Sequence, residues 1–268
     1  ANISWDSIRQ RIIDNLNTVL SEGEFRDYSA LFILASRLRG RQLLINDDDL
    51  LDKITEDGLN AVVAEGPDKG KSALFFLASL PQGRQLLLNN IELRVKITHV
   101  GLNAVIASGL NKGKSALWYL ARSPEGRQLL INDYDLLGKI TDIGLNAVIA
   151  EGEESGPSAL CYLARSPEGR QLLKDDEVLR MKISAEGLNA IVAEGPRKGE
   201  SALLCLAAKP EGRQLLLDDA GLRGKITSKG LNSIVSEGQY KGYSALLCLA
   251  WTSVGLRIIG DKVLRSKI

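Results

Sequence analysis

Apolar residues occur along the chain in short blocks whose spacing fits helices. The clearest block reads Ala-Leu-Phe-Phe-Leu-Ala over 73–78 and directly follows Ser72. At 100° per residue, both the inner and the outer arc of such a helix are apolar. The pattern therefore predicts a short helix that is buried nearly all round and lies at the centre of the fold.

This block is repeated at a fixed interval. Its leading serine returns every 43 residues, at Ser29, Ser72, Ser115, Ser158, Ser201 and Ser244. Such a period is typical of a chain built from one helical unit, in which each unit packs only against its neighbours. We therefore expect a single domain over 1–268, with an N-terminal cap at 1–11 and repeats at 12–54, 55–97, 98–140, 141–183, 184–226 and 227–268.

Each unit carries signals for further helices. The pattern predicts one helix that is capped by Thr55 and ended by Gly66. The sequence Ser-Pro-Glu-Gly-Arg-Gln-Leu-Leu at 123–130 predicts another, because serine caps, proline suits the first helical position and glutamate favours the positive end of the helix dipole. A short helix over 136–140 follows. No segment shows the alternation of a strand, so the predicted fold class is all-α.

The order of these helices resembles an armadillo repeat. The register comes from Ala-Ser-Leu-Pro-Gln-Gly at 78–83 and from Gly-Leu-Asn-Ala-Val at 101–105. The resemblance implies a right-handed α-solenoid superhelix of six repeats, with a concave groove that binds an extended peptide and is lined by the helix after Ser72 and its equivalents. That helix lacks the family's groove asparagine, so the family's contacts to the peptide backbone are not carried over. A HEAT-type or unclassified α-solenoid is the alternative.

Two polar ladders follow the same period. The first consists of asparagines within the opening helix of each unit, at Asn17, Asn60, Asn103, Asn146, Asn189 and Asn232. Asparagine is unfavourable there unless it makes a specific bond, so we expect the amides to bind backbone of an adjacent unit, with ligand contact as the alternative. The second consists of Arg41, Arg84, Arg127, Arg170 and Arg213. We expect these arginines to pair with carboxylates of the same or the next unit, with a phosphate-binding stripe as the alternative.

Composition narrows the possible partners. Of the 268 residues, 44% are hydrophobic, and the net charge is +1, so no overall field attracts nucleic acid or anionic lipid. The sequence has no apolar run long enough to span a membrane, and we expect neither a signal peptide nor membrane contact. Cys161, Cys205 and Cys248 fall in the apolar blocks. We expect buried free thiols, which favour a cytoplasmic or other reducing intracellular compartment.

No group of residues looks catalytic. The segment from Gly66 to Ser72 resembles a phosphate-binding loop, but it is one residue short and follows a helix rather than a strand. The Gly-x-Ser sequences lack the second glycine of a hydrolase nucleophile elbow. The single histidine, His99, cannot supply a partner to a repeated serine or cysteine. We therefore expect no enzyme, no cofactor and no metal site.

Variation among the units marks candidate binding residues, because equivalent positions share one backbone environment. Aromatic residues and arginines stand on the outer arc of the central helices in the second to fourth units: Phe75, Phe76, Trp118, Tyr119, Arg122, Tyr162 and Arg165. These residue types dominate binding hot spots. We expect apolar and stacking contacts from the rings, and pairing of the arginines with acidic or phosphorylated residues. Packing between neighbouring units is the alternative for the rings.

The sequence thus indicates a non-enzymatic scaffold that binds a protein or peptide along its concave face. Nucleic-acid binding along the arginine ladder and a purely structural or designed array are the alternatives. The repeat pattern breaks near the C-terminal end, where Trp251, Val254, Ile258 and Ile259 appear. We expect either burial of this cluster in the last unit of a monomer or a weak dimer through that end.

Overall fold

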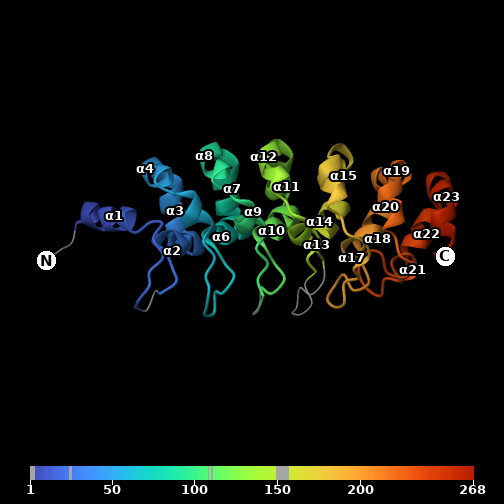
Figure 1. Ribbon diagram of the computed structural model, residues 1–268, viewed down its shortest axis with the longest axis horizontal. Helices are drawn as coiled ribbons and strands as arrows, with labels where there is room; N and C mark the ends of the chain where they lie inside the picture. Colours follow the sequence, from blue (N-terminus) through green and yellow to red (C-terminus); the bar gives the residue numbers. More distant parts are fainter. Residues whose placement is uncertain (1–3, 24–25, 108, 110, 149–156) are drawn as a thin grey trace.

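The computed structural model describes residues 4–23, 26–107, 109, 111–148 and 157–268. These residues form α-helices joined by loops, and no strand occurs within the described ranges, which confirms the all-α prediction. Figure 1 shows the helices following one another along the long axis of the molecule, beginning with α1 (Trp5–Asp14).

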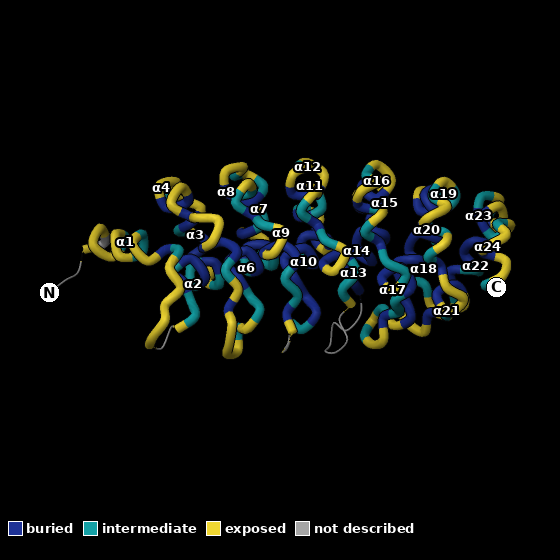
Figure 2. Tube along the Cα trace, viewed as in Figure 1, coloured by how far each residue is buried: buried dark blue, intermediate teal, exposed yellow. Residues whose placement is uncertain are grey.

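The apolar blocks form the central helices, and equivalent helices begin 43 residues apart: α2 (Ala30–Ser36), α6 (Ala73–Ser79), α10 (Ala116–Arg122), α14 (Ala159–Arg165), α18 (Ala202–Ala207) and α22 (Ala245–Ala250). Each packs against the next in chain order. Each begins at a serine cap; in α10, Ser115 Oγ accepts a hydrogen bond of 3.1 Å from the Trp118 amide. Buried positions follow these helices through the middle of the molecule (Figure 2), as the sequence predicted.

A second helix follows each central helix: α3 (Leu38–Asn46), α7 (Pro81–Asn89), α11 (Pro124–Asn132), α15 (Pro167–Asp175), α19 (Pro210–Asp218) and α23 (Ser253–Ile259). Of these, α11, α15 and α19 begin with Pro-Glu-Gly. Ser123 caps α11, and Pro124 takes its first position, as expected. A Cβ on Gly126 would collide with the backbone oxygen and Cα of Leu120. The glycine therefore lets α11 touch the backbone of α10, and the other units repeat this contact.

Two sets of short helices complete each unit. One set comprises α4 (Asp48–Asp52), α8 (Ile91–Val95), α12 (Tyr134–Gly138), α16 (Glu177–Met181), α20 (Ala220–Gly224) and α24 (Lys262–Arg265). The other comprises α5 (Glu56–Asn60), α9 (His99–Asn103), α13 (Asp142–Asn146), α17 (Ala185–Asn189) and α21 (Ser228–Asn232).

The helix predicted to run from Thr55 to Gly66 is shorter than expected, because α5 ends at Asn60. The following backbone pairs with itself instead: the Val63 amide donates to Lys71 O, and the Gly70 amide donates to Val63 O, both at 2.9 Å. Gly66 does adopt a left-handed conformation, with φ of 84°, but it does so at the turn of this loop. Equivalent loops project from one edge of the molecule (Figure 1).

The asparagine ladder joins consecutive units through backbone groups, which confirms its structural interpretation. Asn103 Nδ2 donates to His99 O at 2.6 Å and to Lys139 O at 2.8 Å, and its Oδ1 accepts from the Thr141 amide at 3.0 Å. Asn60, Asn146 and Asn189 make the same set of bonds. Each amide therefore bridges the end of one short helix and the start of the next.

Replacing Asn103 by alanine is expected to lower the free energy of unfolding by about 1–3 kcal/mol, since backbone groups at the junction lose their partners. Asn232 provides a matched control, because among the described residues its amide bonds only to Ser228 of its own helix. Urea unfolding of the Asn103→Ala and Asn232→Ala variants measures the difference. Equal losses in both variants would show that the bridge contributes nothing.

The C-terminal cluster is divided between the interior and the surface. Ile258 is fully buried, Val254 and Ile259 are half-buried, and Trp251 is 67% exposed. Burial in the last unit is therefore correct for Ile258 and wrong for Trp251. Dimer formation through this end stays a prediction.

The three cysteines are free thiols in buried positions, as predicted. A hydrogen bond with Cys161, together with burial, raises the pKa of Cys205. Burial also raises the pKa of Cys248. The thiols of Cys205 and Cys248 are therefore held in the protonated form at neutral pH.

Candidate functional site

A continuous series of aromatic rings crosses four of the central helices and the loop before the first of them. We call it the aromatic ladder; it comprises Tyr28, Phe32, Phe76, Phe75, Tyr119, Trp118 and Tyr162, in order of contact. Ring centroids of successive members lie 4.8–5.6 Å apart. From Phe32 onward the ring planes are nearly perpendicular, the edge-to-face arrangement that aromatic pairs favour.

The ladder follows one packing rule between neighbouring units. The third residue of a central helix contacts the fourth residue of the next one, so that Phe75 meets Tyr119 at 5.3 Å and Trp118 meets Tyr162 at 5.2 Å. In the next junction the same two positions are Cys161 and Cys205, which are both buried. The rings therefore stop where cysteine replaces an aromatic residue at the third position.

The predicted site residues differ in how accessible they are. Phe75, Trp118 and Tyr162 are buried, with 4%, 1% and 8% of their surfaces exposed. Their rings pack against the neighbouring rings of the ladder and expose little area to a ligand. Phe76, Tyr119 and Arg165 are half-buried, and Arg122 is exposed. The part of the predicted set that a partner can reach therefore consists of Phe76, Tyr119, Arg122 and Arg165.

Cations lie over the faces of the ladder. Lys71 is 5.7 Å from the centroid of Phe76, and Arg197 is 5.0 Å from that of Tyr162. Lys114 and Arg122 both approach the Trp118 ring, at 5.2 and 5.1 Å. These distances fit cation–π contacts. Trp118 is also fixed in place by its Nε1–H, which donates to Pro157 O at 2.7 Å.

Sequence reasoning missed the three cations supplied by the loops, Lys71, Lys114 and Arg197. Lys71 and Lys114 come directly before the serine caps, and the sequence around Lys71 indicated only an incomplete phosphate-binding loop. Their position beside a serine that orients an aromatic helix was the available signal. Lys71 is also paired with Asp68 at 2.6 Å.

At the far end of the ladder, Arg165 forms an ion pair of 2.9 Å with Glu200, whose side chain is buried. Burial raises the pKa of Glu200, and the charges of Arg165 and Arg197 oppose this shift. The ladder thus ends in a charged cluster rather than in further rings.

The arginine ladder is used inside the protein. Arg84 Nη1 donates to Ala78 O at 3.1 Å, and its Nε pairs with Glu125 of the next unit at 3.4 Å. Arg127 and Arg170 repeat both contacts with their own neighbours, which confirms the structural interpretation. These guanidinium groups are therefore already engaged with carbonyl groups and carboxylates.

The first and last arginines of this ladder depart from the rule. Gln82 and Val254 stand at the positions that Glu125, Glu168 and Glu211 take beside the other arginines, so neither Arg41 nor Arg213 has a carboxylate partner among the described residues. Arg41 is only 5% exposed, and its Nε has no hydrogen-bond partner in the described part of the chain. Burial lowers the pKa of Arg41, because nothing there compensates for lost hydration.

Replacing Gln82 by glutamate is expected to raise the free energy of unfolding by roughly 1 kcal/mol, because it supplies the carboxylate that Arg41 lacks. Gln42→Glu introduces the same charge at an exposed position of α3 and serves as the control. Thermal and urea unfolding of the two variants tests this. A gain that is equal in both, or absent in Gln82→Glu, would contradict the assignment.

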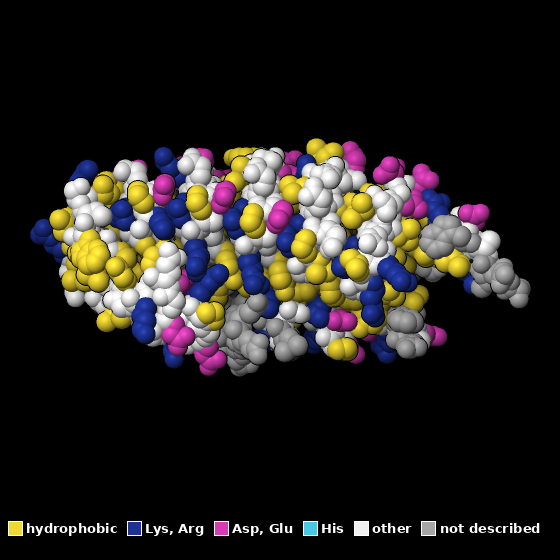
Figure 3. All heavy atoms as spheres, turned by 180° about the vertical axis from the view of Figure 1, so that it is seen from behind, with side chains coloured by type: hydrophobic (Ala, Val, Ile, Leu, Met, Phe, Trp, Pro, Cys, Tyr) yellow, Lys and Arg dark blue, Asp and Glu magenta, His cyan; other side chains and the backbone are white. Residues whose placement is uncertain are grey.

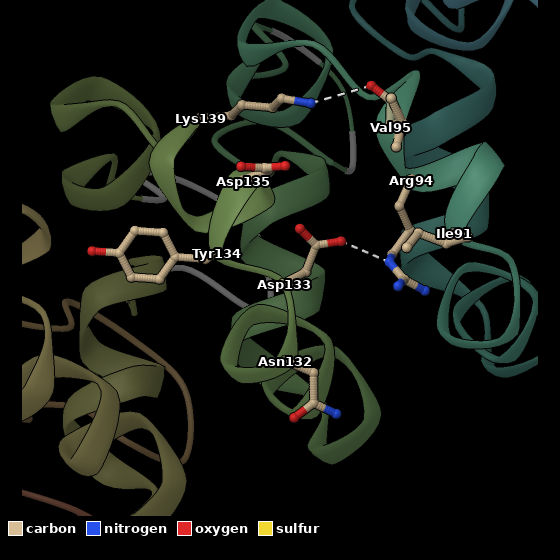
Figure 4. Close-up of a pocket in the computed structure, with 8 residues that line it drawn as sticks. All are labelled: Ile91, Arg94, Val95, Asn132, Asp133, Tyr134, Asp135 and Lys139. Carbon is tan, nitrogen blue, oxygen red and sulfur yellow. Dashed lines mark hydrogen bonds and ion pairs between the residues drawn. The ribbon is translucent and has the colours of Figure 1, made fainter.

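A hollow of about 280 Å³ lies between α8 and α12 (Figure 4). Within it Arg94 pairs with Asp133 at 2.7 Å, and Lys139 Nζ donates to Val95 O at 3.2 Å. Equivalent arginine–aspartate pairs and lysine–carbonyl bonds recur at other junctions. We therefore assign these contacts to the joining of neighbouring units.

Within the described ranges, no cluster of His, Cys, Asp and Glu side chains could hold a metal ion. None of the helices there is both long enough and apolar enough to span a bilayer. Comparison of the chain with models of protein families, with curated proteins and with solved structures gives no match.

Proposed function

We propose that the chain is a right-handed α-solenoid of six armadillo-like 43-residue repeats and serves as a non-enzymatic scaffold for a protein or peptide segment. The regular recurrence of helices, the packing of each central helix on the next and the asparagine bridges support the repeat architecture. The buried free thiols favour a reducing compartment such as the cytoplasm.

The aromatic ladder with its cations is the observation that carries the binding proposal. Phe76 and Tyr119 expose part of their rings while the buried rings of Phe75 and Trp118 hold them in place. Side chains that are already fixed lose little conformational entropy when a partner binds. Aromatic residues and arginine in such settings are the usual hot spots of interfaces.

The charges near the ladder indicate the chemistry of the partner. The exposed Arg122 lies over the Trp118 ring, with Lys114 over the same ring and Arg165 one unit further on. A carboxylate or phosphate that reaches Arg122 from solvent would gain charge-assisted hydrogen bonds. Lys and Arg side chains also lie between hydrophobic ones on the face seen in Figure 3. We therefore propose a partner segment that combines apolar with acidic or phosphorylated residues.

Peptides selected from a random display library against the whole chain are expected to combine apolar and acidic residues and to bind at the ladder. Arg122→Glu should weaken their binding at least about tenfold, since it replaces an attractive charge by a repulsive one. Arg39→Glu, at an exposed position of α3, is the control for net charge. Isothermal titration calorimetry measures both. Peptides whose affinity is the same for both variants and the wild type would contradict the proposal.

A further inference from the structure

A pocket of about 290 Å³ lies near the C-terminal end of the molecule, away from the aromatic ladder. Tyr240 and Tyr243 from the last loop and Trp251 from the end of α22 form aromatic walls, and Arg213 of α19 lies beside them. Tyr243 and Trp251 hold each other edge to face, with centroids 5.5 Å apart. Trp251 is 67% exposed, so the pocket opens to solvent.

Arg213 occupies the same place as the arginines that hold carboxylates in earlier units. Its Nη1 donates to Ala207 O at 2.8 Å, just as Arg170 Nη1 donates to Ala164 O. Arg170 Nε additionally pairs with Glu211 at 3.3 Å. Arg213 has no such ion pair among the described residues, although its guanidinium is anchored by the same carbonyl contact.

The backbone that would carry the missing carboxylate is nevertheless in its usual arrangement. Thr252 Oγ1 accepts from the Gly255 amide at 3.0 Å, as Ser166 does from Gly169. Gly255 also packs against the backbone of Leu249 in the manner of the other units. Only the side chain differs, since Val254 takes the place of glutamate. Among the described residues, no carboxylate therefore pairs with Arg213.

The aromatic walls are specific to this junction. One unit earlier, the positions of Tyr240, Tyr243 and Trp251 hold Arg197, Glu200 and Ala208. An aromatic enclosure alone would also suit a cation. A neighbouring guanidinium repels cations and attracts carboxylates, so the two features together select an anion that carries an apolar group. Burial raises the pKa of Tyr240, which keeps its phenol neutral and adds no competing negative charge.

We propose that this pocket binds a carboxylate that is attached to an apolar or aromatic group, as presented by an acidic peptide segment of a partner protein. Arg213 supplies the charge, and Tyr240, Tyr243 and Trp251 enclose the apolar part. This site lies beyond the proposed function at the ladder and does not depend on it.

The proposal is tested on the full chain with 3-phenylpropionate and its charge-reversed analogue 3-phenylpropylamine as probes. Binding is followed by the ¹⁵N indole resonance of Trp251, which is assigned by Trp251→Phe. The acid should shift this resonance saturably, and the amine should bind at least about tenfold more weakly. Equal binding of both probes, no binding of the acid, or a shift confined to the Trp118 resonance would overturn the proposal.

Two variants test the role of Arg213 from opposite sides. Arg213→Gln removes the charge but keeps a polar side chain with an amide donor, and Val254→Glu supplies an internal carboxylate that competes with the probe. Each should weaken binding of 3-phenylpropionate at least about tenfold. Val263→Glu adds the same charge at an exposed position of α24 and should leave the affinity unchanged, as should Arg122→Glu at the ladder. Circular dichroism shows whether each variant is folded. If Arg213→Gln does not fold, the test rests on Val254→Glu. A Val254→Glu variant that binds 3-phenylpropionate with wild-type affinity would refute the assignment of this pocket.

Discussion

Replacing Gly126 by alanine is expected to lower the free energy of unfolding by about 3 kcal/mol or more. The added Cβ would collide with the backbone oxygen and Cα of Leu120, and these atoms cannot move unless α10 and α11 separate. Because the contact lies in the middle of the chain, such a shift would also disturb the packing of the next units. Urea unfolding followed by circular dichroism measures the loss.

Gly138→Ala provides the matched control for this substitution. Gly138 is also helical, but a Cβ there would meet no atom within 4 Å. The change should therefore be neutral or stabilise the protein by about 0.5–1 kcal/mol through helix propensity. A similar response of the two variants would mean that the close contact between α10 and α11 does not determine stability.

Replacing Trp118 by alanine is expected to cost about 3–5 kcal/mol of stability, the range for a large buried side chain. The ring is 1% exposed, contacts Tyr119 and Tyr162, and donates to Pro157 O. Trp118→Phe retains a ring in the ladder and loses the hydrogen bond, so an intermediate loss is expected. Chemical unfolding of both variants separates the contribution of the hydrogen bond from that of the buried ring.

Trp251→Ala is the control for Trp118→Ala, since Trp251 is exposed and, among the described residues, its ring stacks only with Tyr243. Its cost should stay below about 1 kcal/mol. Equal costs at Trp118 and Trp251 would show that the ladder does not stabilise the central helices. Because Trp118→Ala is expected to damage the fold, Tyr119 and Arg122 are the better positions at which to test ligand binding.

Local sequence signals predicted much of the fold. Serine caps at 72 and 115 and the Ser-Pro-Glu-Gly start at 123 are satisfied within a few residues of the chain, so they can be recognised without tertiary structure. The asparagine bridges were predicted in kind, because a polar residue within a buried helix requires partners. Their acceptors, such as Lys139 O, became identifiable only in the structure.

The end of α5 shows where such signals fail. Val62 and Val63 continue the apolar spacing of a helix beyond Asn60, but Val63 is also buried when its backbone pairs with Lys71. The spacing of apolar residues indicates which side chains are buried, but it does not indicate which groups the backbone amides and carbonyls bond to. The loops that bring Lys71 and Lys114 over the aromatic rings were therefore missed together with the end of the helix.

The sequence predicted which residues belong to the candidate site but not how deeply each of them is buried. A helical arc places Phe75 and Phe76 on one side, yet it does not state how closely the next central helix approaches. That approach buries Phe75 and leaves Phe76 partly open. The division between supporting and accessible rings depends on the spacing of neighbouring units, which is not encoded within a single unit.

The packing rule that links the third residue of one central helix to the fourth residue of the next has a consequence for how the array can change. Each junction is specified by two residues from different units, such as Trp118 with Tyr162 and Cys161 with Cys205. Loss of the unit at 98–140 would bring Phe75 opposite Tyr162, a pair of the kind already present. Loss of the unit at 141–183 would bring Trp118 opposite Cys205, so that Trp118 would lose its aromatic partner and the series would end one ring earlier. The residue pairs at the junctions therefore specify the order of the units. The chain should tolerate the deletion of some units better than the deletion of others.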